Sequence, residues 1–126
     1  MKMVGSKLRV LVVDDEPLIV WGIVSFLRER MAVKTVGSAE AAIEEIETKK
    51  YDLCLMDFNL PGITGLEAMK IINERSPNTK VAIMSGSFMD EVLRAKIQDH
   101  AFAYIEKPFD LKDISCVAER AAVAVN

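Results

Sequence analysis

Five short apolar runs alternate with five longer amphipathic segments along the 126 residues of this chain. The runs are rich in Val, Leu and Ile, which is typical of strands buried on both faces of a sheet. The longer segments repeat apolar residues at helical spacing, as helices with one buried face do. Strands that alternate with helices form a parallel sheet with right-handed crossovers and helices on both faces. The sequence therefore predicts a doubly wound α/β fold.

The expected elements have the following bounds. Strands are expected at Leu8–Val13, Val33–Val36, Leu53–Met56, Val81–Met84 and Ala103–Ile105. The first helix is expected to begin at Pro17, with apolar positions that recur at helical spacing as far as Met31. The second is expected to follow an N-cap at Ser38 and to end at Lys49. The last three are expected from after Gly65 to about Arg75, from about Asp90 to Asp99, and from near Asp110 onward. Proline suits the first turn of a helix, and serine is a common N-cap.

Composition narrows the class of protein. A chain that is 51% hydrophobic and 28% charged is globular, and its net charge of -3 argues against a nucleic-acid surface. No apolar run approaches the roughly 20 residues that span a bilayer, and the N-terminus does not resemble a signal peptide, so we expect a cytoplasmic protein without membrane contact.

Cys54 and Cys116 lie in apolar segments and are expected to be reduced core residues. Trp21 lies one position off the apolar stripe of its helix and is expected to be half-buried.

Charged and polar side chains follow four of the five expected strands. In an open parallel sheet, binding sites form just outside the carboxyl ends of the strands, so we expect these side chains to meet at one edge. Clustered carboxylates can all stay ionised when a divalent cation lies among them, and oxygen ligands suit Mg²⁺. A phosphoryl group could then bridge the cation and a lysine, with one carboxylate as the nucleophile. The residues concerned are Asp14, Asp15 and Glu16 after the first strand, Asp57 after the third, Ser85 after the fourth, and Glu106 and Lys107 after the fifth.

Four stretches of the chain resemble the receiver domain of two-component response regulators. They are V-L-V-V-D-D-E-P at 10–17, Y-D-L-C-L-M-D-F-N-L-P-G-I-T-G at 51–65, V-A-I-M-S-G at 81–86 and A-Y-I-E-K-P-F at 103–109. Each motif alone is weak, whereas all four in this order are highly specific, and the resemblance extends from Leu8 to about Ala122. It implies a flavodoxin-like (βα)5 sandwich with strand order 2-1-3-4-5, in a single receiver domain over residues 1–126 with a core at about 8–122.

The resemblance also implies roles at the sheet edge. Asp57 is similar to the phosphoacceptor, which a histidine kinase or phosphotransfer protein phosphorylates in the presence of Mg²⁺ (or Mn²⁺). Asp14 and Asp15 resemble the acidic pair that holds the metal with Asp57, and Asn59 occupies the position whose backbone carbonyl completes the metal site. Lys107 matches the lysine that pairs with a phosphoryl oxygen. Such a domain is no enzyme beyond its own phosphorylation and dephosphorylation.

Further implied features concern the response to phosphorylation. Ser85 matches the hydroxyl residue that turns toward the phosphoryl group, and Tyr104 matches the aromatic residue that moves inward with it. The Lys107–Pro108 peptide is expected to be cis. The fourth helix, fifth strand and fifth helix form the usual output surface, which would contact a downstream effector protein or an output domain missing here, or a second copy in a phosphorylation-dependent homodimer.

This sequence departs from the family pattern at a few positions. His100 replaces the glycine that usually ends the fourth helix in a left-handed conformation, so that helix end is expected to differ. Ser85 replaces the commoner threonine. Asn59 and Ser87 hold the two positions that border the site and tune the phosphoryl lifetime.

Other interpretations remain open at this point. The acids could merely cap the first helix. The chain could be a scaffold that keeps the fold without phosphorylation, although such proteins usually lack a key residue. It could also be a phosphohydrolase with an aspartate nucleophile, although Asn59 stands where those enzymes have a second, acidic Asp. A flavin-binding protein would need a phosphate loop after the first strand, where this chain has acids.

Overall fold

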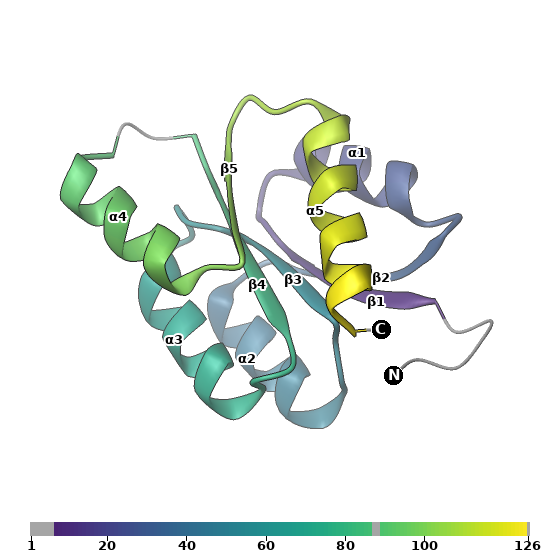
Figure 1. Ribbon diagram of the computed structural model, residues 1–126, viewed down its shortest axis with the longest axis horizontal. Helices are drawn as coiled ribbons and strands as arrows, with labels where there is room; N and C mark the ends of the chain where they lie inside the picture. The colour runs from purple at the N-terminus through teal and green to yellow at the C-terminus, as the bar shows by residue number, and fades with distance from the viewer. Residues whose placement is uncertain (1–6, 87–88, 126) are drawn as a thin grey trace.

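A computed structural model of the chain describes residues 7–86 and 89–125, so Ser87 lies outside the described residues. Five parallel strands form one sheet in the order β2-β1-β3-β4-β5, as predicted (Figure 1). The elements along the chain are β1 (Leu8–Val13), α1 (Pro17–Leu27), β2 (Met31–Val36), α2 (Ala39–Thr48), β3 (Leu53–Asp57), α3 (Gly65–Arg75), β4 (Lys80–Ser85), α4 (Glu91–His100), β5 (Ala103–Glu106) and α5 (Leu111–Val125).

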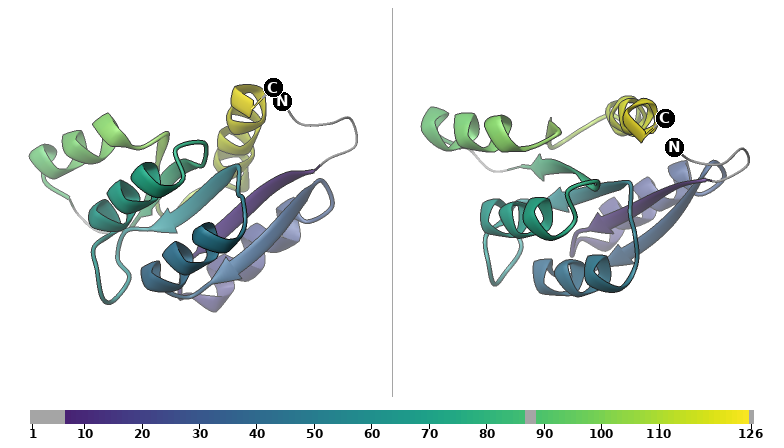
Figure 2. Two further views of the ribbon diagram at one scale, coloured as in Figure 1. Left: turned by 90° about the horizontal axis from the view of Figure 1, so that it is seen from below. Right: turned by 60° about the horizontal axis from the view of Figure 1, so that its bottom comes forward.

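Helices cover both faces of the sheet, and the strand alternation explains why. Successive side chains of a strand point to opposite faces, so one strand contributes to two cores. In β1, Leu11 and Val13 pack in a cluster with α2, α3 and α4, whereas Val10 and Val12 pack in a second cluster with α1 and α5. All four are fully buried. On the first of these faces, α2 and α3 lie side by side in the views of Figures 1 and 2.

Four helices begin at side-chain caps, and in α5 the carboxylate of Asp110 accepts a hydrogen bond from the Lys112 N–H. The hydroxyl of Ser38 accepts a hydrogen bond from a backbone N–H in the first turn of α2, Thr64 does the same for α3, and the carboxylate of Asp90 does so for α4. Such caps satisfy donors that have no partner within the helix. Helix α1 differs, because Glu16 at its N-cap makes no side-chain cap and Pro17 opens the helix. The Glu16 side chain thus contacts Lys107 and does not cap α1.

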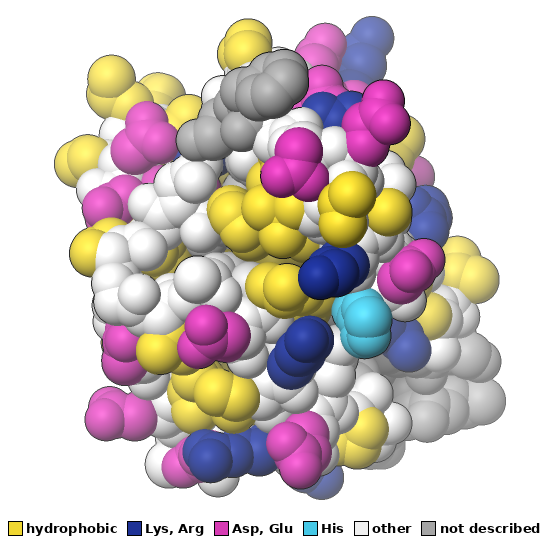
Figure 3. All heavy atoms as spheres, turned by 90° about the vertical axis from the view of Figure 1, so that its left-hand side faces the viewer, with side chains coloured by type: hydrophobic (Ala, Val, Ile, Leu, Met, Phe, Trp, Pro, Cys, Tyr) yellow, Lys and Arg dark blue, Asp and Glu magenta, His cyan; other side chains and the backbone are white. Residues whose placement is uncertain are grey.

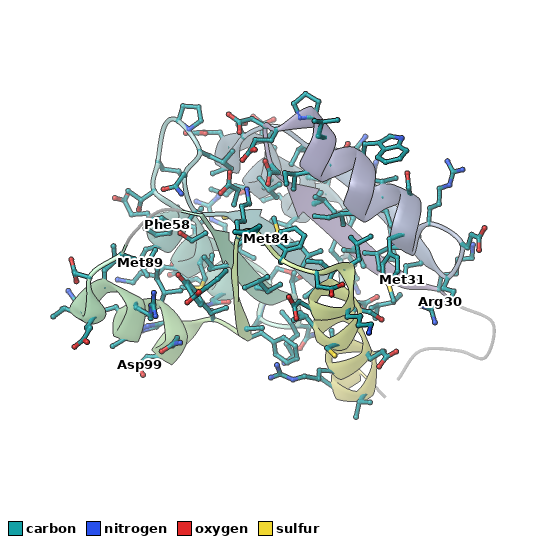
Figure 4. The ribbon with its side chains drawn as sticks, turned by 90° about the horizontal axis from the view of Figure 1, so that it is seen from above. Arg30, Met31, Phe58, Met84, Met89 and Asp99 are labelled. Atoms are coloured by element: carbon teal, nitrogen blue, oxygen red, sulfur yellow. The ribbon has the colours of Figure 1, made fainter. Side chains whose placement is uncertain are left out.

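The predicted extension of the first helix to Met31 is wrong. Helix α1 ends at Leu27, and Met31 opens β2, where it pairs with Leu8 of β1. Figure 4 labels Arg30 and Met31 together, past the last turn of α1. The half-buried Met31 side chain packs on the same apolar cluster as α1, so its spacing matched a helix although its backbone is extended.

Two burial expectations are also wrong. Trp21 is 70% exposed, and Cys116 is exposed on α5, whereas Cys54 is buried as expected. Two residues that are two positions apart lie about 200° apart around a helix axis. Trp21 precedes the buried Ile23 by two positions, and Cys116 follows the buried Ile114 by two, so both point away from the core.

The end of α4 differs from the left-handed glycine ending of the family, as expected. The helix continues through His100, and no non-glycine residue of the described chain has a positive φ. Ala101 then turns extended while its N–H still donates to Ile97, and the side-chain amide of Asn73 in α3 donates to the His100 carbonyl. His100 itself is exposed, and Figure 3 shows it in cyan beside Lys and Arg side chains.

Candidate functional site

Most of the side chains predicted to meet at the carboxyl edge of the sheet do meet there, but Asp15 is exposed outside the carboxylate group and Glu106 pairs with Arg94 of α4. Asp14, Asp57 and Ser85 are 3%, 3% and 2% exposed, at the ends of β1, β3 and β4. Figure 4 looks down on this edge and labels Phe58 and Met84, which are the chain neighbours of Asp57 and Ser85. The Phe58 N–H donates to the Met84 carbonyl at 2.8 Å, which ties the segment after β3 to β4.

Lys107 lies at the centre of this edge. Its ammonium donates to Asp14 Oδ2 at 2.9 Å and to Glu16 Oε1 at 3.1 Å, and lies 3.5 Å from Asp57 Oδ1. The side chains of Asp14, Lys107 and Asp57 are 0%, 11% and 4% exposed, whereas that of Glu16 is 59% exposed. One cation therefore faces three carboxylates, two of them buried.

The backbone around β4 and β5 holds Lys107 in this position. Its N–H donates to the Ser85 carbonyl at 2.8 Å, and the peptide bond to Pro108 is cis, as the resemblance implied. A Cβ at Gly86 would lie 3.2 Å from the Lys107 Cβ, which is closer than ordinary van der Waals contact. The absence of a side chain at Gly86 thus leaves room for the lysine stem.

The surroundings of Asp57 raise the pKa of its carboxyl above the ordinary value. Burial raises the pKa of Asp57 most strongly, and the negative charge of Asp14 raises it as well. The Asn59 N–H, which donates to Asp57 Oδ1 at 3.2 Å, and the Lys107 ammonium lower this pKa by less, so the net shift is upward. Burial lowers the pKa of Lys107, but the hydrogen bonds to Asp14 and Glu16 together with the nearby negative charges raise it by more, so its net shift is upward. The site thus has excess negative charge, which a further cation would relieve.

Ser85 and Tyr104 are the two residues that the resemblance associates with the response to phosphorylation. The Ser85 Oγ is buried and has no hydrogen-bond partner among the described residues. Buried hydroxyls are rarely left unpaired, so this one is available for an acceptor that enters the site. Tyr104 of β5 is half-buried against the cluster under α4, and the Arg94 guanidinium lies 5.6 Å from the centre of its ring.

A family model described as the response regulator receiver domain matches residues 10–119. The chain belongs to this family. Receiver domains are signalling domains rather than conventional enzymes, and among the described residues of this one no helix has the length and apolar character needed to cross a membrane.

Curated relatives of this receiver domain are transcriptional regulators by name. It is 33% identical over 101 residues to the transcriptional activator protein ExaE of Pseudomonas putida, covering 78% of this chain and 47% of that protein. It is 34% identical over 118 residues to the DNA-binding transcriptional regulator NtrC of Proteus hauseri, covering 92% of this chain and 25% of that protein. The receiver domain thus spans between a quarter and a half of the length of these relatives.

Solved structures agree with the fold. A CheY-like receiver domain protein from Methanospirillum hungatei has a TM-score of 0.85 at 26% identity, covering 93% of this chain and 95% of that one. The BeF3-activated DrrB receiver domain has a TM-score of 0.82 at 24% identity, covering 93% and 98%. The second likeness concerns the fold alone.

The carboxylates of this receiver domain could hold a metal ion. Oxygens of Asp14, Glu16 and Asp57 all lie within 4.8 Å of one another. Such an all-oxygen set suits a hard divalent cation. Asp15, which the sequence analysis expected to be a ligand, is exposed and lies outside this group.

Glu16 is the residue at this site that the sequence analysis expected at the sheet edge but to which the family resemblance assigned no role. Strand periodicity does not predict its position, because the chain bends at Asp15 between β1 and α1. The Glu16 N–H donates to Asp14 Oδ1 across this bend, and the Glu16 side chain returns to the side of Asp14 and accepts a hydrogen bond from Lys107.

Proposed function

We propose that this domain is the phosphoacceptor of a two-component phosphorelay in the cytoplasm and that Asp57 carries the phosphoryl group. The observation that carries the proposal is the buried carboxylate of Asp57 beside both Asp14 and the Lys107 ammonium. The donor is the phosphohistidine of a histidine kinase or phosphotransfer protein. A carboxylate oxygen of Asp57 attacks phosphorus, the P–N bond breaks, and the imidazole leaves with the bonding electrons.

The chain's own residues supply positioning and charge neutralisation, which is most of what phosphoryl transfer requires. The N–H of Asn59 fixes one carboxylate oxygen of Asp57. Lys107 is within reach to pair with an oxygen of the transferred group, and the unpaired Ser85 hydroxyl is available to donate to another.

A metal belongs to this proposal. Asp14, Asp57 and the backbone carbonyl of Asn59 would hold Mg²⁺ or Mn²⁺, with Asp15 contributing through water. When bound, the metal neutralises charge on the oxygens of the transferred group. The close set of carboxylate oxygens supports this assignment.

We further propose that phosphorylation biases a two-state equilibrium through Ser85 and Tyr104 and so changes the face formed by α4, β5 and α5. A downstream effector, an output domain or a second copy would bind there. In this proposal residues 1–126 form one receiver domain with its core at about 8–122, and neither nucleic acid nor membrane contacts it.

The test is incubation with acetyl phosphate and Mg²⁺, followed by intact mass measurement. We expect one phosphoryl adduct that is absent from Asp57→Asn and from a sample with EDTA. Metal binding without an adduct, even with a phosphorylated histidine donor, would favour a scaffold. Sustained multiple turnover of a phosphate ester would instead favour a phosphohydrolase.

A further inference from the structure

Glu16 has a different setting from the two acids that precede it. Asp14 is buried and Asp15 is exposed outside the carboxylate group, whereas Glu16 is exposed yet contacts Lys107 at 3.1 Å. The Glu16 N–H also donates to Asp14 Oδ1 at 2.9 Å. Its backbone is therefore tied to the site, while its side chain lies at the rim.

The ammonium of Lys107 has three N–H donors, and three carboxylates surround it. A phosphoryl group on Asp57 would add oxygens that need the same donors. Asp14 and Asp57 are short, buried side chains fixed by backbone hydrogen bonds. Glu16 is the longer and more exposed of the three and is held to the site by Lys107, so its contact is the one that an incoming anion would displace.

We propose that Glu16 competes with a phosphoryl group on Asp57 for the Lys107 ammonium and thereby limits how tightly this group is held. This inference rests on the proposed function. Glu16 is a positioning residue in this account, because it acts through Lys107 and does not contact the phosphoryl group. Its negative charge also repels the oxygens of that group, which adds to the same effect.

The effect should be moderate because Glu16 is more than half exposed. Ion pairs with such exposure contribute up to about 1 kcal/mol, which corresponds to a factor of about five in an equilibrium constant. We therefore expect removal of this charge to strengthen anion binding by about twofold to fivefold. The gain should shrink in molar salt, which screens exposed charges more than buried ones.

The test uses beryllofluoride, which mimics a phosphoryl group on a carboxylate, at saturating Mg²⁺. Its apparent dissociation constant would be measured by fluorine NMR for the wild type, for Glu16→Gln and for Glu29→Gln. Glutamine keeps the length of the side chain and removes the charge. Glu29 is exposed just beyond α1, so its variant is a control for net charge. Mg²⁺ binding alone would be titrated in parallel.

Tighter beryllofluoride binding by Glu16→Gln, with Glu29→Gln equal to the wild type, is the expected result. Equal binding by all three proteins would overturn the inference and leave the proposed function intact. Weaker binding of both Mg²⁺ and beryllofluoride by Glu16→Gln would make Glu16 a metal ligand and would also overturn it. A wild-type protein that binds Mg²⁺ but takes neither beryllofluoride nor a phosphoryl group would overturn the proposed function, and this inference with it.

Discussion

Replacement of Lys107 by methionine removes the one cation that the described structure places among the three carboxylates. The ion pair with Asp14 is almost fully buried, and the carboxylate of Asp57 is buried beside it. Removing one partner of a buried ion pair typically costs about 3–5 kcal/mol. Two unit charges 4.8 Å apart, the upper limit for these oxygens, repel by about 3.5 kcal/mol at an effective dielectric constant of about 20. We therefore expect Lys107→Met to lose about 3 kcal/mol of unfolding free energy in EDTA at neutral pH.

The loss should depend on pH with a defined sign. Without Lys107, the Asn59 N–H alone opposes the burial and the Asp14 charge that already raise the pKa of Asp57. A carboxyl whose pKa is higher in the folded than in the unfolded state takes up a proton on folding, so its charge destabilises the protein above its unfolded pKa. As the pH falls through the folded pKa of Asp57, protonation removes the repulsion. The difference in unfolding free energy between Lys107→Met and the wild type should therefore narrow as the pH falls from neutral.

Mg²⁺ should also narrow the difference in unfolding free energy between Lys107→Met and the wild type. A divalent cation that binds the carboxylates replaces the missing charge, and a ligand at about one hundred times its dissociation constant adds about 2.7 kcal/mol to stability. Urea unfolding followed by circular dichroism, with and without Mg²⁺, measures both effects. The exposed Lys70→Met on α3 is the control and should stay within about 0.5 kcal/mol of wild type. A loss that is equal in EDTA and Mg²⁺ and at all pH values would refute the electrostatic reasoning and indicate a packing defect.

Three further predictions concern the scaffold. Ser38→Ala removes the cap of α2 and should cost about 1 kcal/mol in urea unfolding. Trp21→Ala should change the unfolding free energy by less than about 0.5 kcal/mol because Trp21 is exposed. Leu27→Ala in the same helix should cost about 2–5 kcal/mol because the Leu27 side chain is buried, and thermal melts of the two variants compare them directly. A thiol reagent should label Cys116 in the native protein and Cys54 only after unfolding, since burial raises the Cys54 pKa to about 12, and mass spectrometry of the labelled peptides distinguishes the two.

The order of elements was predictable because two periodicities separate strands from helices in this chain. Buried runs such as Leu53–Met56 have no polar residue, and Ser38 marks a helix start that the structure confirms. The errors arose where periodicity is ambiguous. Met31 continues the apolar spacing of α1, yet β2 is an edge strand whose exposed and half-buried residues give no strong strand pattern. Only pairing with β1 decides its conformation, and this pairing is not local.

The convergence at the sheet edge was predictable from topology alone. Asp14, Asp57, Ser85 and Lys107 each follow a parallel strand, and parallel strands bring their carboxyl ends to one side. The direction of side chains in the segment after a strand was harder to predict. The sequence analysis treated Asp14 and Asp15 as a pair because the family does, whereas the chain bends at Asp15 and brings Glu16 to the site together with Asp14.

The three clustered carboxylates of Asp14, Glu16 and Asp57 are best understood together with Lys107. A lysine ammonium is a compact charge on a flexible stem, and it can lie 2.9–3.5 Å from three carboxylates at once. A planar guanidinium would favour a bidentate pair with one of them. Because each contact is a single hydrogen bond or close approach, Lys107 can exchange one carboxylate for a phosphoryl oxygen without leaving the site. In the proposed function, the repulsion among the acids would therefore be offset by Lys107 before phosphorylation, and the same ammonium would be available to the phosphoryl group afterwards.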